Sequence, residues 1–229
     1  MGRAWIVALA LASGLAQAVE PKLPELELRY AAAWKGMNLG EIVVTLKSEG
    51  GPDCYRYESR TNPVGLVRMF YGKPHETSEF CVAGGAIVPK RFVFDSRGDS
   101  FALDFDPASG KVRDGRGKVR DIPANAQDRF GLQQAVRLWA IANQSSKEPG
   151  SVEFALVDDD RVRVYRFAIT ARERIEIPAG KFDTIRVERV DSPNRISRYW
   201  IAPERGWMPV KVESGKDGKI QLRMELKAS

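Results

Sequence analysis

Alternation of apolar and polar residues runs through most of this chain and constrains its fold more than any other feature. Near the C-terminus, Leu222, Met224 and Leu226 alternate with polar or charged neighbours. Successive side chains of a β-strand point to opposite faces, so a period of two predicts strands with one buried face. Turn-forming residues separate these segments, and short strands joined by such turns favour an antiparallel sheet or barrel. The predicted strands are 25–29, 40–48, 53–60, 77–83, 87–95, 101–106, 151–157, 161–170, 173–178, 182–190, 195–202, 207–214 and 219–227.

Residues 128–143 depart from this pattern. Their apolar positions recur every three or four residues, which is typical of an amphipathic helix, and Asp128 or Asn125 is suited to cap its first turn. The apolar positions are Leu132, Ala135, Val136, Leu138, Trp139 and Ala142. No low-complexity linker divides the strands before the helix from those after it. The sequence therefore predicts a mainly β fold: a single curved antiparallel sheet or open barrel, with one amphipathic helix packed against it and Trp139 buried.

The first 18 residues have the features of a secretory signal peptide. Arg3 gives a short positive region, residues 5–12 are apolar, and Ala16 and Ala18 form a small-x-small cleavage site. The apolar run is shorter than the roughly 20 residues that a membrane span requires, although an N-terminal anchor is the alternative. We expect 1–18 to be removed and 19–229 to form a single β-rich exported domain. The predicted location is the periplasm, without an integral membrane span.

The two cysteines, Cys54 and Cys81, fall in predicted strands. In an oxidising compartment an even pair of cysteines indicates a disulfide. The alternative is a catalytic thiol paired with His75, the only histidine. Such a pair needs a third group to orient the base, and no recognisable candidate is present.

Few residues are suited to catalysis or metal binding. One histidine and two cysteines are too few for a typical zinc site, and the nucleophile-elbow, phosphate-loop and dinucleotide motifs do not occur. Residues 158–160 are three aspartates without the spacing of a calcium loop, and they predict a hairpin turn. No cofactor, metal or catalytic residue is therefore predicted. Paired carboxylates, of which Asp104 and Asp106 are an example, stay open as an alternative because such pairs meet only in the fold.

The formal net charge is +6 at pH 7. No block of five like charges occurs, so no nucleic-acid partner is predicted. Arginine binds phosphate and carboxylate groups well, which would suit an anionic envelope molecule. An ordinary charged surface explains the same composition.

Residues 62–70 are largely apolar but contain Pro63 and Gly65, which disfavour a regular strand. We predict that this segment covers an apolar cavity on the concave face of the sheet, with helix 128–143 as a second wall. In this hypothesis Arg68 meets an acidic group of the ligand at the rim; the alternative is that the segment is a fixed part of the core. The candidate ligand-binding residues are Val64, Leu66, Arg68, Met69, Phe70 and Trp139.

Several motifs carry a family resemblance. They are 126–130 (AQDRF), 177–186 (IPAGKFDTIR), 199–203 (YWIAP) and 208–211 (MPVK). Together they resemble the proteobacterial envelope family named domain of unknown function 3108. The resemblance covers nearly the whole chain after residue 18 and implies an exported, β-rich domain; it transfers no catalytic residue. The expected architecture is also similar to the half-barrel carriers of lipoproteins and lipids.

These features favour a non-enzymatic periplasmic envelope protein that binds a lipid-like or amphipathic ligand, such as a lipid or an anionic glycan, in an apolar cleft. Two alternatives stay open. One is a carboxylate-dependent carbohydrate-active enzyme that uses the same cleft, and the other is a scaffold in an envelope complex.

Overall fold

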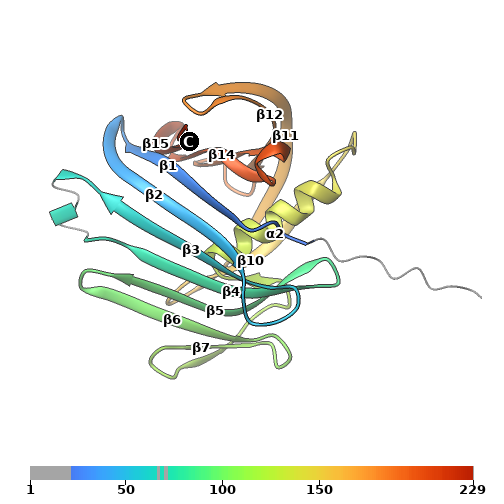
Figure 1. The fold of residues 1–229 in the computed structure, drawn as a ribbon. Helices are drawn as coiled ribbons and strands as arrows, with labels where there is room; N and C mark the ends of the chain where they lie inside the picture. The colour runs from blue at the N-terminus through green and yellow to red at the C-terminus, as the bar shows by residue number, and fades with distance from the viewer. Residues whose placement is uncertain (1–21, 66–67, 70–71, 229) are drawn as a thin grey trace, which may run out of the picture.

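The computed structural model describes residues 22–65, 68–69 and 72–228. Its strands form one 15-stranded sheet that curves around helix α2 (Figure 1). The predicted signal peptide lies outside the described residues. The strands before the helix are β1 (Leu26–Trp34), β2 (Met37–Ser48), β3 (Cys54–Pro63), β4 (His75–Ala83), β5 (Ala86–Ser96), β6 (Asp99–Asp106), β7 (Lys111–Asp114), β8 (Val119–Asp121) and β9 (Ala126–Gln127). After α2 (Arg129–Ala142) come β10 (Ser151–Val157), β11 (Val162–Ile177), β12 (Gly180–Arg189), β13 (Arg195–Ala202), the 3-10 helix η1 (Pro203–Arg205), β14 (Met208–Lys216) and β15 (Lys219–Leu226).

The strand order runs from β8 to β1 and then from β15 to β9. Neighbouring strands are antiparallel, except that β9 and β10 are parallel. The first and last strands therefore pair at the centre of the sheet, while β8 and β9 form its two edges. Only residues 122–125 connect these edges, and an extended chain of that length spans about 18 Å at most. The sheet must therefore curl round until its edges lie close together.

The predicted fold class is confirmed, with differences in detail. Predicted strands 161–170 and 173–178 are one strand, β11, whose pairing with β12 shifts register between Ile169 and Ala171. This irregularity interrupts the alternation and makes one strand look like two. The short strands β7, β8 and β9 were not predicted, because two to four residues are too few to show a period.

Helix α2 lies inside the curve of the sheet and is buried on two sides. Ala135 and Leu138 belong to the larger apolar cluster, which includes residues of β1–β6. Val136 and Ala140 belong to a second cluster with residues of β11–β13. The prediction that the helix packs against the sheet is thus confirmed. Trp139 is a correction: it packs on the second cluster but is only partly buried, because it borders an open groove on the surface.

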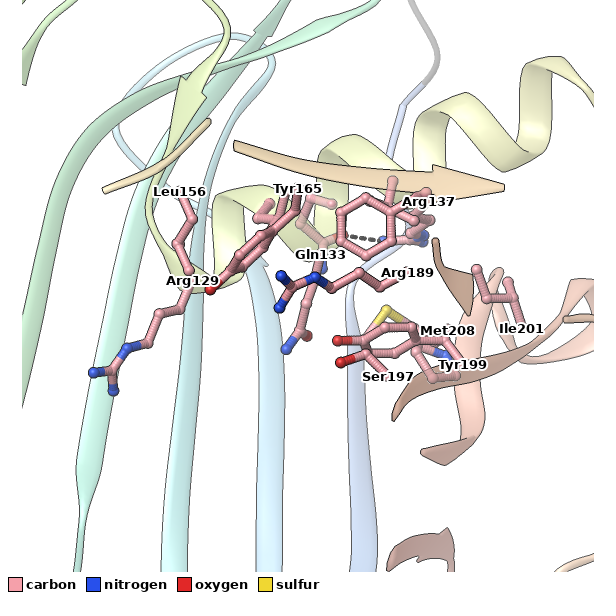
Figure 2. A pocket seen from close by; sticks show the side chains of 15 residues that line it. Arg129, Gln133, Arg137, Leu156, Tyr165, Arg189, Ser197, Tyr199, Ile201 and Met208 are labelled. Carbon is pink, nitrogen blue, oxygen red and sulfur yellow. Dashed lines mark hydrogen bonds between the residues drawn. The ribbon is translucent and has the colours of Figure 1, made fainter. Parts of the chain in front are cut away.

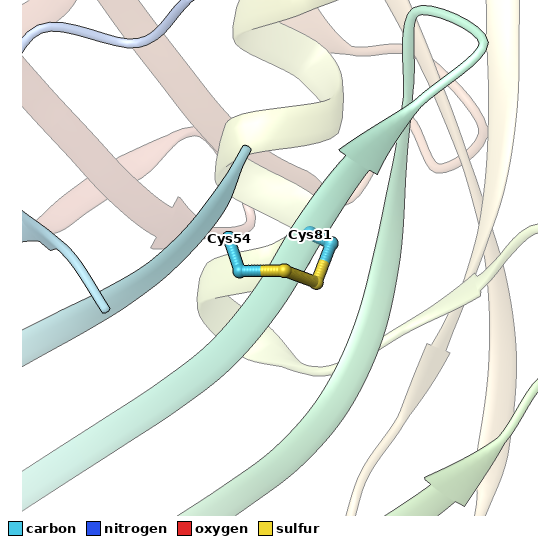
Figure 3. Close-up of a disulfide and its surroundings, with 2 residues drawn as sticks. All are labelled: Cys54 and Cys81. Carbon is cyan, nitrogen blue, oxygen red and sulfur yellow. A yellow bond between two sulfur atoms is a disulfide. The ribbon is translucent and has the colours of Figure 1, made fainter. Parts of the chain in front are cut away.

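The predicted disulfide joins Cys54, at the start of β3, to Cys81 in β4 (Figure 3). The two residues lie directly opposite each other in the antiparallel pair. The alternative of a catalytic thiol is wrong, since both cysteines of the chain are oxidised. His75 instead lies at the start of β4 and hydrogen-bonds with Glu58.

Candidate functional site

A cavity of about 200 Å³ lies between helix α2 and the inner face of strands β11–β14 (Figure 2). Its apolar lining residues are Leu132, Val136, Leu156, Phe167, Ile201 and Met208. Leu132 and Val136 are one turn apart on the helix, and four-residue spacing directs both to one face. The strands contribute residues at inward-facing positions. The lining is therefore mostly apolar, which is typical of a site for an apolar or amphipathic molecule.

Polar groups reach the middle of this cavity from three elements. Figure 2 shows the polar ends of Gln133, Arg189 and Tyr199 directed toward its centre, with the Ser197 hydroxyl close to that of Tyr199 in this view. Among the described residues that line it, none is an aspartate or a glutamate. The cavity therefore offers hydrogen-bond donors in an apolar setting.

The positive charge of Arg189 is neutralised by an ion pair with Asp191. Its Nε and one terminal nitrogen donate to the two carboxylate oxygens of Asp191, at 2.8 and 2.6 Å. Its guanidinium carbon lies 3.8 Å from the centre of the Tyr165 ring. The hydrogen bonds to Asp191 raise the pKa of Arg189 above its ordinary value. Arg189 is thus held in place with its charge balanced by its own partner.

Arg137 differs from Arg189 because no described carboxylate pairs with its charge. It lies in the middle of α2, lines the cavity and is only 2% exposed. Its guanidinium donates to Gln134 Oε1 at 2.7 Å and to the Gly206 carbonyl oxygen, both neutral acceptors. Its Nε has no hydrogen-bond partner among the described residues. Burial lowers the pKa of Arg137 to about 10, although nearby tyrosines oppose this shift.

The Gly206 carbonyl owes its position to a local turn. Gly206 ends η1 with a φ of +62°, in the left-handed region that glycine adopts without strain. A Cβ at this residue would lie 3.1 Å from Pro24 Cγ. The glycine therefore lets the chain turn tightly beside Pro24 while its carbonyl oxygen accepts from Arg137.

A second cavity, of about 260 Å³, lies next to the first on the side of β1–β4. The two share Gln133, Tyr199, Met208 and Pro209 as lining residues. Glu76 lines the second cavity, and burial raises its pKa even though Arg129 opposes the shift. Arg129 donates to Glu76 at 3.0 Å and to Asp158 at 2.9 Å, so both carboxylates are held in ion pairs.

Asp128 caps the helix that forms the cavity wall, as the sequence predicted. Its carboxylate accepts from the backbone N–H groups of Phe130 and Gly131, at 2.8 and 2.9 Å. The hydroxyl of Ser78 in β4 donates to the other oxygen at 2.8 Å, which ties the helix start to the sheet. Asp128 is fully buried, and burial raises its pKa to about 6 despite these hydrogen bonds.

The raised pKa of Asp128 predicts a pH dependence of stability. Because the folded pKa of about 6 exceeds the ordinary value near 3.9, its contribution is fully present below pH ~4 and is lost as pH rises through 6. Asp128→Asn keeps an acceptor for the helix N–H groups but does not titrate. The free energy of unfolding of the wild type minus that of D128N should fall by up to about 3 kcal/mol between pH 4 and 8. Urea unfolding at several pH values measures this difference; parallel pH profiles would contradict it.

The residues predicted to bind ligand are not gathered at the cavity. Val64, Arg68 and Met69 are exposed, and Gly65, Arg68 and Met69 have helical backbone. In Figure 1 the ends of β3 and β4 that flank this segment lie far from α2. Leu66 and Phe70 lie outside the described residues. Helix α2, which was predicted to form the second wall, does line the observed cavity. No described residue of 62–70 lines it.

Trp139 lines a different hollow, an open groove of about 420 Å³ on another side of α2. Leu138 and the β10 residue Phe154 also contribute to it. At its edge Gln127 Nε2 donates to the carbonyl oxygen of Ile87 at 2.9 Å. Neither Trp139 nor any described residue of 62–70 therefore lines the cavity between α2 and strands β11–β14.

The sequence alone did not indicate that Gln133, Arg137, Arg189 and Tyr199 line a cavity. A signal existed for two of them. Within residues 130–142 the polar side chains are Gln133, Gln134 and Arg137 alone, and a helix that is apolar almost all round is buried. Its few polar side chains were therefore the ones to examine.

Within 22–65, 68–69 and 72–228, no group of three or more histidine, cysteine, aspartate or glutamate residues could hold a metal ion. In the same part of the chain, no helix combines the length and hydropathy needed to cross a membrane.

The fold and the site define the class of protein: a mainly β protein whose open sheet curves around one buried helix and leaves a largely apolar internal cavity. The chain belongs to the family described as Protein of unknown function (DUF3108), whose model matches residues 29–227. The family resemblance of the sequence motifs is thus confirmed. No curated protein matches the chain. The crystal structure of a DUF1089 family protein from Pseudomonas aeruginosa matches with a TM-score of 0.42 and 11% identity, over 94% of this chain and 99% of that one.

Proposed function

We propose that this protein is a non-enzymatic binding protein of the bacterial periplasm, which takes the apolar part of an amphipathic ligand between α2 and strands β11–β14. The observation that carries the proposal is the cavity: about 200 Å³, mostly apolar, with a few polar groups directed into it. Apolar walls with few convergent polar groups are characteristic of small-molecule sites. In an ordinary core such space is filled, since protein interiors pack densely.

The periplasmic location is supported by two features. The disulfide between Cys54 and Cys81 is of a kind that persists in oxidising compartments and is rare in the cytosol. Residues 1–18 have the sequence pattern of a secretory signal peptide. Both features fit an exported protein that meets lipids of the cell envelope.

The cavity itself is the target of the test. Val136 is 5% exposed and lines the cavity, so Val136→Phe places a phenyl ring in the proposed chain path. Val164, on β11, is 54% exposed and lies outside the cavity, so V164F is a matched control. Burial of apolar surface contributes about 25 cal/mol per Å², so excluding roughly 55 Å² of the probe's surface lowers affinity about tenfold. We therefore expect V136F to bind the uncharged fluorescent probe N-phenyl-1-naphthylamine at least about tenfold more weakly than the wild type.

The measurement is a fluorescence titration, with a thermal melt of each variant to establish that it is folded. V164F should bind the probe with the affinity of the wild type. Undiminished binding by folded V136F, or no binding by the wild type, would refute the proposal.

A further inference from the structure

We infer that the cavity selects an anionic amphiphile, a single alkyl chain that ends in a carboxylate or phosphate, and that Arg137 binds its head group. The inference rests on the proposed function, because it assigns the charge and the chain number of the ligand of that same cavity.

The first step is the charge of Arg137. Arg137 is 2% exposed, and both hydrogen-bond acceptors of its guanidinium group are neutral: the side-chain oxygen of Gln134 and the carbonyl of Gly206. No described aspartate or glutamate forms a salt bridge with it, in contrast to Arg129 and Arg189. A buried charge is normally paired or bound to a counter-ion. The missing partner is therefore an anion that none of the described residues supplies.

The second step is an unused donor. Arginine carries five N–H donors in a fixed planar arrangement. The Nε of Arg137 is buried and has no hydrogen-bond partner among the described residues. Buried donors without partners are rare in folded proteins and require an explanation. Arg137 lines the cavity on its helix side, so an oxyanion that reaches this part of the wall would accept from it, and carboxylate and phosphate are the groups that arginine binds best.

The third step concerns what is attached to the anion. Most of the cavity wall is apolar, with Val136 and Phe167 among its residues. A free inorganic anion would leave this apolar surface unused. The volume of about 200 Å³ is below the roughly 300–1,000 Å³ of sites for drug-sized molecules. A single alkyl chain fits this space better than a two-chain lipid.

The test compares four compounds on the full-length mature chain: dodecanoate, dodecyl phosphate, the uncharged dodecanol, and inorganic phosphate. The three chain compounds compete with bound N-phenyl-1-naphthylamine below their micelle-forming concentrations, and inorganic phosphate is titrated by calorimetry. A hydrogen bond to a charged group corresponds to roughly a tenfold to hundredfold change in affinity. We expect both anionic amphiphiles to bind at least about tenfold more tightly than dodecanol.

Variants assign this preference to a residue. Arg137→Met removes the charge and should bring the affinity for dodecanoate down to that for dodecanol, with little change for dodecanol itself. Arg68→Gln removes one positive charge at an exposed residue and should keep the full preference, which controls for net charge. A melting curve establishes whether R137M is folded. If it is not, the comparison of dodecanoate with dodecanol on the wild type still decides whether the cavity selects an anionic amphiphile.

The outcomes separate the two proposals. Equal binding of dodecanol and dodecanoate by the wild type overturns the anion assignment and leaves the binding function intact. An unchanged preference in folded R137M overturns the role of Arg137. Inorganic phosphate that binds as tightly as dodecyl phosphate shows a free-anion site and overturns the assignment to an amphiphile. Failure of every chain compound to displace the probe overturns the proposed function and this inference together.

Discussion

Replacing Phe130 by alanine should destabilise the protein by about 3–5 kcal/mol, as truncation of a packed aromatic ring generally does. Phe130 lies in the first turn of α2 and is 7% exposed. Its ring centre is 4.5 Å from that of Tyr57 in β3 and 6.2 Å from that of Phe92 in β5. It therefore joins the start of the helix to two strands of the first half of the sheet. For a chain of this size the loss corresponds to a fall in melting temperature of between about 6 and 20 °C.

Two control variants make this prediction specific. Trp139→Ala, near the other end of α2, should cost less than F130A because Trp139 is only partly buried. Val164→Ala, at an exposed residue of β11, should change the free energy of unfolding by no more than about 0.5 kcal/mol. Calorimetry and urea unfolding of the three variants measure these values. A smaller effect for F130A than for W139A would mean that the helix is anchored at its C-terminal end instead.

Loss of the disulfide should have an effect of similar size. The bond closes a loop between residues 27 apart in sequence, and the loop-entropy relation assigns such a link about 3.5 kcal/mol. Cys54→Ser combined with Cys81→Ser should therefore lower the free energy of unfolding by about that amount. Unfolding of the wild type in dithiothreitol should show the same loss, whereas the double variant should not respond to the reductant.

Thiol titration provides an independent check on the same bond. In protein purified and denatured without reductant, a thiol reagent should detect no free thiol. Two reactive thiols per chain, or a double variant as stable as the oxidised wild type, would contradict the prediction.

The cavity was only partly predictable from the sequence. The three- and four-residue spacing in 128–143 located the helix that forms one wall. The cover assigned to 62–70 was inferred from its apolar composition alone, and the exposed Val64 and Met69 show why that inference was weak. Single exposed apolar side chains are common on protein surfaces, so composition does not say which segment faces a cavity.

The periodicity of α2 had a similar limit. Leu132, Ala135, Val136 and Leu138 all contact the core, so the apolar positions occupy more than one face. An apolar stripe identifies the buried face of a surface helix. In a helix surrounded by the sheet it does not tell which face meets a cavity, and so it could not show that Trp139 lines a separate groove.

The sequence by itself determined the local features of this protein. Alternation over short segments specified the strands, Asp128 specified the start of the helix, and two cysteines in neighbouring strands left one possible pairing. The strands and the helix start depend on residues that are close together in the chain. The disulfide follows because two cysteines can pair in only one way. Only the tertiary structure decided that β1 pairs with β15 and that Arg137 meets the carbonyl of Gly206, 69 residues away. Long-range neighbours depend on how the whole sheet curls around the helix. Arg137 is buried, without an ion pair to any described residue, only because that curl encloses it.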